Sequence, residues 1–334
     1  MQITVLGAGA WGTTLANLLS RGENRVRLWG HDPAHIKALG GNRINPACAA
    51  FRAVDPEVRV EWDLDMACQS SEGLVIAVPS KGMRSLAHHL ASALTGSIPI
   101  VSVTKGIEFE TGLTMCGVLL DAGLPNPVAA LSGPTLAEEV FRGMPSAVVL
   151  ASDCQLTALW GQALFHRPSF RVYASEDRLG VELGGALKNV IAIAAGVSDG
   201  LGFGDNSKAA LVTRAIVEIR RLGVACGAHD ETFSGLSGLG DLTVTCFSKL
   251  SRNRAMGERL GKGESVDKVL GTMTSVAEGY PTARSAWQLA RAKGINTPII
   301  DEVYSMLYEG KDVKEALKSL VARDSKWEGE MGRV

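Results

Sequence analysis

The chain has 334 residues, 46% of them hydrophobic, and a formal net charge of −1. This length predicts two domains, and the balanced charge without a long basic run disfavours nucleic acid and anionic membrane surfaces as partners. Six scattered cysteines without a C-x-x-C pair indicate reduced thiols of a cytoplasmic protein, and the six histidines show no metal-site spacing, so we expect no metal. We expect neither a signal peptide nor an apolar run long enough to span a bilayer.

The first residues predict a dinucleotide-binding turn. The short apolar run 3–6 leads into Gly7-Ala8-Gly9-Ala10-Trp11-Gly12, with the spacing G-x-G-x-x-G, and an Ala- and Leu-rich helical stretch follows at 13–19. In such a unit one glycine allows the tight turn, the second lets the backbone approach a pyrophosphate, and the third lets helix and strand pack closely. The alternative, a plain structural turn, fits the order of strand, turn and helix less well.

Five further apolar runs predict buried strands in the first half, at residues 74–78, 98–103, 128–131, 147–150 and 170–173. Continuous Val/Ile/Leu runs separated by helical patterns are typical of parallel strands covered on both faces. We therefore predict an α/β fold that begins with a Rossmann-type doubly wound sheet over residues 1–176. Ligands bind beyond the carboxyl ends of such strands, so the loops at Pro79, Lys105 and Gly133 should line one crevice with the glycine turn.

Helical periodicity dominates after residue 176 and predicts an all-helical domain over residues 177–334. The expected helices lie at 178–197, 208–222, 252–260, 266–270, 282–292, 298–307 and 313–320. A short apolar run from Leu242 to Cys246 could form a strand, but its neighbours are helical, so its assignment stays open.

Lys188 is the most informative residue of the second half. It lies off the apolar stripe of its helix, and its neighbours three and four positions away are Gly184, Gly185, Ile191 and Ala192. A single ammonium among small residues is expected to have a lowered pKa and suits a proton donor or acceptor. The alternative is a lysine that extends to solvent at a domain edge.

Other candidates also have structural alternatives. Lys105 follows a strand and could be a surface lysine, and Gly133-Pro134-Thr135 could hold a ligand or cap a helix. Asp241 could be a turn carboxylate or the orienting partner of a lysine. Ser251-Arg252-Asn253 at a helix start suits a small phosphate, but a capped, solvated helix start has the same composition.

Together these residues resemble one family, the bacterial-type NAD(P)-dependent glycerol-3-phosphate dehydrogenases, over nearly the whole chain. The block from Leu183 to Ala192 around Lys188 is the most specific match. The other matching motifs are Gly7 to Thr13, Trp29 to Asp32, Val78 to Ser80, Thr104 to Gly106, Leu131 to Thr135, Gly238 to Leu242 and Ser251 to Asn253.

The resemblance implies a Rossmann domain that binds NAD(P), and a helical substrate domain like that of 6-phosphogluconate dehydrogenase. It implies interconversion of dihydroxyacetone phosphate and sn-glycerol 3-phosphate, which feeds glycerophospholipid synthesis, with Lys188 as the proton donor and acceptor. The implied substrate-binding residues are Lys105, Gly133, Thr135, Lys188, Asp241, Ser251, Arg252 and Asn253. The implied nucleotide-binding residues are Gly7, Gly9, Ala10, Trp11, Gly12, His31, Lys105, Ala137, Arg252, Val276 and Glu278.

Two other functions compete with this interpretation. Ketopantoate reductases and 3-hydroxyacid dehydrogenases share the domain arrangement but act on carboxylates, whereas the Ser251–Asn253 stretch favours a phosphate. A non-catalytic dinucleotide sensor would not need Lys188. The spacing of Asp32 suits NAD, but Gly30 and His31 would leave room and a cation beside the ribose. We expect both NAD(H) and NADP(H) to work, NADPH better, in a cytoplasmic enzyme that is a homodimer by its family.

Overall fold

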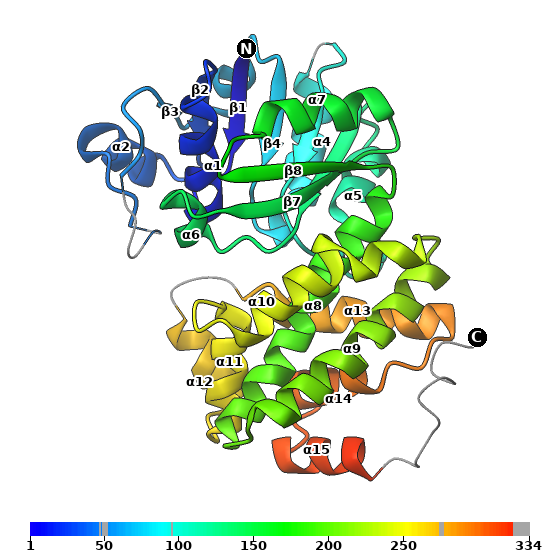
Figure 1. Cartoon of the computed structure of the whole chain (residues 1–334). Helices are drawn as coiled ribbons and strands as arrows, with labels where there is room; N and C mark the ends of the chain where they lie inside the picture. Colours follow the sequence, from blue (N-terminus) through cyan, green and yellow to red (C-terminus); the bar gives the residue numbers. More distant parts are fainter. Residues whose placement is uncertain (47, 49–52, 95, 274–276, 323–334) are drawn as a thin grey trace. The chain divides into compact units, whose positions relative to one another are not determined.

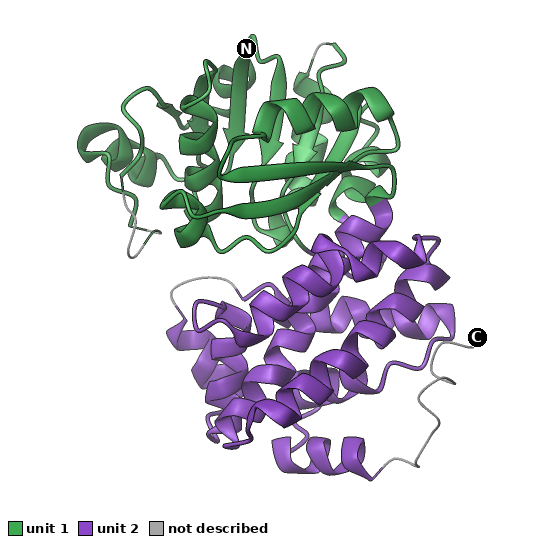
Figure 2. Cartoon of the chain, in the orientation of Figure 1, with its two compact units in different colours: residues 1–105, 115–178 green, residues 106–114, 179–334 purple. Residues whose placement is uncertain are grey.

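The structure is a computed structural model that describes residues 1–46, 48, 53–94, 96–273 and 277–322. The chain separates into two compact units (Figures 1 and 2). Unit 1 comprises Met1–Lys105 and Met115–Arg178, and unit 2 comprises Gly106–Thr114 and Leu179–Val334. The short segment Gly106–Thr114 thus belongs to the helical unit although its sequence neighbours belong to the sheet, an excursion that no sequence pattern predicted.

Unit 1 contains one eight-stranded sheet in the order β3-β2-β1-β4-β5-β6-β7-β8. All neighbouring strands are parallel except β6 and β7. The strands are β1 (Gln2–Leu6), β2 (Arg25–Trp29), β3 (Arg59–Glu61), β4 (Gly73–Ile76), β5 (Ile100–Ser102), β6 (Val128–Ser132), β7 (Ser146–Ala151) and β8 (Phe170–Ser175). The predicted doubly wound, mostly parallel sheet is confirmed, and its central strands are buried on both faces as the apolar runs predicted.

Helices connect these parallel strands by crossovers, which are right-handed in nearly all sheets of this kind. The chain leaves β1 toward β2 through α1 and leaves β4 toward β5, in the opposite direction along the sheet, through α4. Right-handed connections running in opposite directions place their helices on opposite faces, so both faces of the sheet are covered. The helices of unit 1 are α1 (Ala10–Ser20), α2 (Pro33–Asn42), α3 (Leu64–Cys68), the 3₁₀ turn η1 (Ser80–Gly82), α4 (Met83–Ala93), α5 (Met115–Asp121), α6 (Ala137–Phe141) and α7 (Gln155–Phe165).

Unit 2 is helical, as predicted, and its elements surround one long helix, α8 (Figure 1). Its elements are α8 (Arg178–Gly200), α9 (Asp205–Ala225), the 3₁₀ turn η2 (Asp230–Ser234), the π-helix η3 (Leu236–Gly240), α10 (Asp241–Phe247), α11 (Arg252–Gly261), α12 (Val266–Thr272), α13 (Gly279–Lys293), α14 (Pro298–Tyr308) and α15 (Val313–Val321). The open assignment at Leu242–Cys246 is resolved, because this run lies inside α10 and is helical.

Helix α8 is the core helix of unit 2. By length and composition it is apolar enough to cross a membrane, which the sequence analysis did not expect. Its most apolar window is nevertheless 94% buried inside the protein, which is the behaviour of a core helix surrounded by other helices.

Glycines bring α8 and α11 into backbone contact. A Cβ added to Gly196 would lie 2.0 Å from the carbonyl oxygen of Arg254, and a Cβ on Gly257 would lie 2.0 Å from that of Ile193. Gly200 and Gly261, one turn further along each helix, face each other in the same way. Because side chains would hold the helix axes further apart, this crossing depends on glycine at these positions.

A buried carboxylate completes the N-terminal end of α14. Glu218 of α9 accepts hydrogen bonds from the backbone N–H groups of Ile299 at 3.0 Å and Ile300 at 2.8 Å. These N–H groups belong to the first turn of α14 and have no partner within the helix. Burial raises the pKa of Glu218 to about 7, while the two hydrogen bonds oppose this shift.

The glycine turn after β1 allows a prediction about stability. A Cβ on Gly12 would lie 1.9 Å from the carbonyl oxygen of Gly7, whereas a Cβ on Gly9 would meet nothing within 4 Å. We expect Gly12→Ala to lower the free energy of unfolding by about 3 kcal/mol or more, the upper range for an overpacked site. Gly9→Ala, the matched control, should cost about 1 kcal/mol or less. Urea unfolding of both variants measures the difference, and equal losses would contradict this account of the turn.

Candidate active site

The glycine turn of unit 1 is built to hold an anionic group. Gly7 has φ +124°, and a Cβ there would lie 2.5 Å from the carbonyl oxygen of Ala77, so the turn after β1 requires glycine. Gly9 is the exposed N-cap of α1, and no side chain caps this helix. The first-turn N–H groups of a helix lack intrahelical partners and attract phosphate. The open space above Gly9 lets a pyrophosphate reach them, so this turn fits a dinucleotide.

Two buried polar side chains hold the turn in place. Asn45 is fully buried and donates to the carbonyl oxygen of Ala8 at 2.9 Å and to Oγ1 of Thr13 at 2.6 Å. Thr14 of α1 donates to the carbonyl oxygen of Ala137 at 3.3 Å, which ties the start of α6 to the glycine turn. Ala137 therefore lies beside this turn, whereas sequence analysis did not identify Asn45, whose partners are distant in the chain.

The end of β2 differs from the expected open ribose site. The space above Gly30 is filled, since a Cβ there would lie 2.7 Å from the side chain of Ile36 and 3.0 Å from Cβ of Ala8. Asp32 is the N-cap of α2, where its carboxylate accepts from the backbone N–H of Ala34 at 2.9 Å. His31 is exposed beside it. A carboxylate held by its own helix is less available to a ribose diol.

The predicted loops of unit 1 do meet at one edge of the sheet. β1, β4, β5 and β6 are parallel neighbours, so their carboxyl ends lie side by side. Thr104 donates to the carbonyl oxygen of Val78 at 2.7 Å, and Lys105 donates through Nζ to that of Gly133 at 3.2 Å. Thr135 donates to the same oxygen at 3.0 Å and is not a helix cap, because α6 begins at Ala137 after Leu136. Of the two alternatives for this stretch, the helix cap is therefore excluded at Thr135.

In unit 2, Lys188 forms a buried ion pair. Its Nζ lies 3.0 Å from Oδ1 of Asp241 and donates to Oγ1 of Thr245 at 2.8 Å, and Thr245 donates to the carbonyl oxygen of Asp241 at 2.6 Å. Lys188 is 8% exposed and Asp241 is 1% exposed. Asp241 is thus the partner of the lysine rather than a turn carboxylate, and the isolated ammonium that the sequence predicted is paired.

The small residues around Lys188 make this pair possible. A Cβ on Gly184, one turn before Lys188, would lie 2.7 Å from the carbonyl oxygen of Ser237 in η3. The backbone of η3 therefore lies directly against α8, and α10 begins at Asp241 immediately afterwards. Thr245, four residues after Asp241, lies on the same helical face. Sequence analysis missed Thr245 because the run around it was not assigned as a helix. In a helix, the four-residue spacing from Asp241 would have predicted that the two side chains lie together.

The start of α11 lies beside this pair, with its side chains in different roles. Ser251 is the N-cap and accepts from the N–H of Arg254 at 3.2 Å. Asn253 donates to Oδ1 of Asn189, the residue after Lys188, at 2.8 Å and accepts from the N–H of Gly279 at 2.9 Å. The Arg252 side chain, by contrast, is exposed.

The structure brings the predicted residues into one group in each unit. In unit 1 the group comprises Gly7, Gly9, Ala10, Trp11, Gly12, Lys105, Gly133, Thr135 and Ala137, with His31 at the neighbouring strand end. In unit 2 it comprises Lys188, Asp241, Ser251, Arg252 and Asn253. Glu278 precedes α13, where Gly279 is bonded to Asn253, and Val276 lies outside the described residues.

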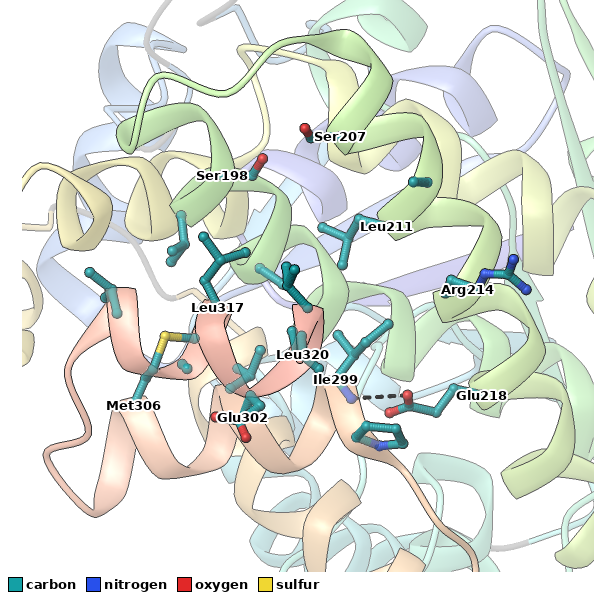
Figure 3. Close-up of a pocket in the computed structure, with 18 of the residues that line it drawn as sticks. Ser198, Ser207, Leu211, Arg214, Glu218, Ile299, Glu302, Met306, Leu317 and Leu320 are labelled. Carbon is teal, nitrogen blue, oxygen red and sulfur yellow. Dashed lines mark hydrogen bonds between the residues drawn. The ribbon is translucent and has the colours of Figure 1, made fainter. Parts of the chain in front are cut away.

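Unit 2 also has a cavity of about 890 Å³ to which none of these residues contributes (Figure 3). It is lined mainly by apolar side chains of α8, α9, α14 and α15, among them Leu211, Ile299 and Leu320. Glu218 lies at one end, with its hydrogen bond from Ile299 (Figure 3). The candidate site of unit 2 is the group of charged and polar side chains around Lys188 and Asp241, which does not line this cavity.

Comparisons with known proteins agree with this arrangement. Family models described as the NAD-dependent glycerol-3-phosphate dehydrogenase N-terminus and C-terminus match residues 2–158 and 177–318. Glycerol-3-phosphate dehydrogenases (NAD(P)+) from Geobacter metallireducens and Chlorobium luteolum are 45% and 46% identical to the chain over 330 and 329 residues. These alignments cover 98% of this chain in both cases, and 98% and 99% of the respective relatives.

A solved structure is similar over the same length. The crystal structure of glycerol-3-phosphate dehydrogenase from Coxiella burnetii has a TM-score of 0.93 and 33% identity, covering 96% of this chain and 99% of that chain. The resemblance that the motifs predicted is confirmed. The chain therefore belongs to the NAD-dependent glycerol-3-phosphate dehydrogenase family and is an oxidoreductase that uses NAD(H) or NADP(H).

Proposed function

We propose that the enzyme interconverts dihydroxyacetone phosphate and sn-glycerol 3-phosphate. The observation that carries the proposal is the buried ammonium of Lys188, held by Asp241 and Thr245 beside the start of α11. A ketone phosphate needs both a proton donor for its carbonyl oxygen and a site for its phosphate, and unit 2 offers a candidate for each. We further propose that the enzyme is a cytoplasmic homodimer whose product feeds glycerophospholipid synthesis.

Unit 1 is the proposed nucleotide domain. The pyrophosphate would lie on the first turn of α1 at Gly9, Ala10, Trp11 and Gly12, with Ala137 beside it and His31 near the ribose. The remaining proposed nucleotide residues are Gly7, Lys105, Arg252, Val276 and Glu278. When bound, the nicotinamide supplies or accepts the hydride, and the protein determines its position.

Lys188 is the proposed proton donor and acceptor. Reduction of the C2 carbonyl forms a C–H bond from the hydride and an O–H bond whose proton comes from the Lys188 ammonium. Positive charge at Nζ also stabilises the negative charge that develops on the oxygen. Asp241 and Thr245 fix the position of Nζ, so the ammonium does not have to reorient during the reaction. In the oxidation direction the neutral amine accepts the proton from the C2 hydroxyl.

Arg252 is the proposed phosphate-binding side chain. It is exposed at the first turn of α11, whose backbone N–H groups add positive potential. Ser251 and Asn253 would contribute mainly by holding this turn, because their side chains already bond Arg254, Asn189 and Gly279. Lys105, Gly133 and Thr135 of unit 1 complete the proposed set of substrate residues.

The phosphate site predicts a strong substrate preference. Dihydroxyacetone phosphate should oxidise the reduced nicotinamide, and unphosphorylated dihydroxyacetone should be a very poor substrate. Arg252→Ala should cost about 2–5 kcal/mol in kcat/KM, the range for removing one partner of a charge pair, because the bound phosphate would bury this exposed side chain. Arg259→Ala, on the same helix but paired with Glu264 at the surface, is the control and should behave like the parent. Absorbance at the nicotinamide band measures all variants. Parental kcat and KM in Arg252→Ala would contradict the assignment.

The end of β2 predicts the nucleotide preference. Asp32 caps α2 instead of projecting freely toward a ribose, and His31 beside it is exposed. We therefore expect both nucleotides to be used, with a higher kcat/KM for NADPH. Steady-state kinetics with NADH and NADPH in turn provide the test. A preference for NADH of about tenfold or more, 1.4 kcal/mol in binding terms, would contradict the proposed preference.

A further inference from the structure

A second group of buried charges joins the helices of unit 2 near Lys188. Arg254 of α11 places Nη2 2.6 Å from Oδ2 of Asp199 at the end of α8, and Lys208 of α9 places Nζ 2.6 Å from Oδ1 of the same carboxylate. We call these three residues the Asp199 cluster; their side chains are at most 13% exposed. Arg254 also lies 3.4 Å from Glu258, one turn along α11.

The Asp199 cluster and the Lys188–Asp241 pair contact the same helix, α10. Nζ of Lys208 lies 5.1 Å from the centroid of the Phe247 ring in α10, and α10 begins at Asp241, the partner of Lys188. The cluster is therefore a neighbour of the reacting site, although no step of the proposed reaction uses it.

Stability alone is a weak reason for such a cluster. The cost of removing charges from water offsets most of their attraction, and apolar residues of similar volume often serve as well or better. A buried ionic contact can instead fix the relative position of the helices that carry its charges, since the charges attract strongly only in a narrow range of arrangements. Arg254 of α11 and Lys208 of α9 both pair with Asp199 of α8, so the cluster links three helices at one point. The contact of Arg254 with Glu258 lies within α11 and orients the guanidinium toward Asp199.

The position of Arg254 connects this restriction to the substrate. Arg254 is the third residue of α11 and follows directly after Arg252 and Asn253, and its N–H is the group that Ser251 caps. Glycine contacts with Gly196 already set how closely α11 approaches α8. Those contacts lack direction about the helix axis, so the first turn is oriented by the ionic contact of Arg254 together with the hydrogen bonds of Asn253.

We propose that the Asp199 cluster positions the first turn of α11 so that Arg252 and the N–H groups of that turn meet the substrate phosphate. This inference rests on the proposed function, because it explains how the proposed phosphate site is positioned. Arg254 acts through Arg252 and is a positioning residue. Its loss should therefore weaken binding of the phosphate more than it slows the reaction of bound substrate.

The test compares Arg254→Met with Arg259→Met, a control on the same helix whose arginine forms a surface pair with Glu264. In Arg254→Met we expect the KM for dihydroxyacetone phosphate to rise by about tenfold or more while kcat stays within about threefold of the parent. Inorganic phosphate, followed by calorimetry and as a competitive inhibitor, should lose affinity by a similar factor. Arg254→Lys, which keeps one contact with Asp199, should restore part of the loss.

Three results would overturn the inference: an unchanged KM, a kcat that falls as far as kcat/KM, or an undiminished affinity for inorganic phosphate. If Arg254→Met does not fold, Arg254→Lys and the isosteric Asp199→Asn test the inference instead, by the same comparison of KM and kcat with the parent. Failure of the proposed function would give a different result: the parent and Arg259→Met would not turn over dihydroxyacetone phosphate. The calorimetric comparison of phosphate binding would still decide the role of the cluster.

Discussion

A lysine ammonium buried in a helical core is stable only if a counter-charge is held beside it. In unit 2 that counter-charge is Asp241, 3.0 Å from the Nζ of Lys188, and much of the local structure follows from the need to bring it there. Gly184 admits the backbone of η3 against α8, and α10 then begins at Asp241 itself. A larger side chain at Gly184 would separate the two charges without touching either.

Glycines also determine how closely α8 and α11 cross. Gly196 and Gly257 allow direct backbone contact, which carries the start of α11 to the neighbourhood of Lys188. Asn253 then bonds Asn189 on α8 and the first residue of α13. The elements that carry the proposed proton donor and the proposed phosphate site are thus connected by hydrogen bonds and close contacts rather than by loops. A site held by rigid helices keeps its geometry when substrate binds.

The sequence was sufficient for most of the sheet and for most helices of unit 2, because buried parallel strands read as continuous apolar runs and long helices as clear periodicity. It missed the short edge strand β3. The G-x-G-x-x-G turn was predicted for the right reason, as Gly7 and Gly12 each leave no room for a Cβ. Local sequence patterns could not predict features that depend on contacts between residues distant in the chain. The sequence left two alternatives for Asp241, and the long-range contact with Lys188 decides between them. No pattern predicted that the irregular segment Gly106–Thr114, between β5 and α5, belongs to the helical unit. Likewise, the role of Asn253 depends on partners 26 and 64 residues away.

The central claim is that Lys188 supplies the proton, and not merely a charge that stabilises the core. Lys188→Met alone removes the cation that faces the buried Asp241 carboxylate, which should cost about 3–5 kcal/mol of stability. The informative protein is therefore the double variant Lys188→Met/Asp241→Asn, in which neither charge remains. We expect it to recover most of that stability and to bind nucleotide like the parent, while kcat with dihydroxyacetone phosphate falls by about a hundredfold or more. A stable double variant that turns over within about threefold of the parent would show that the proton comes from another group.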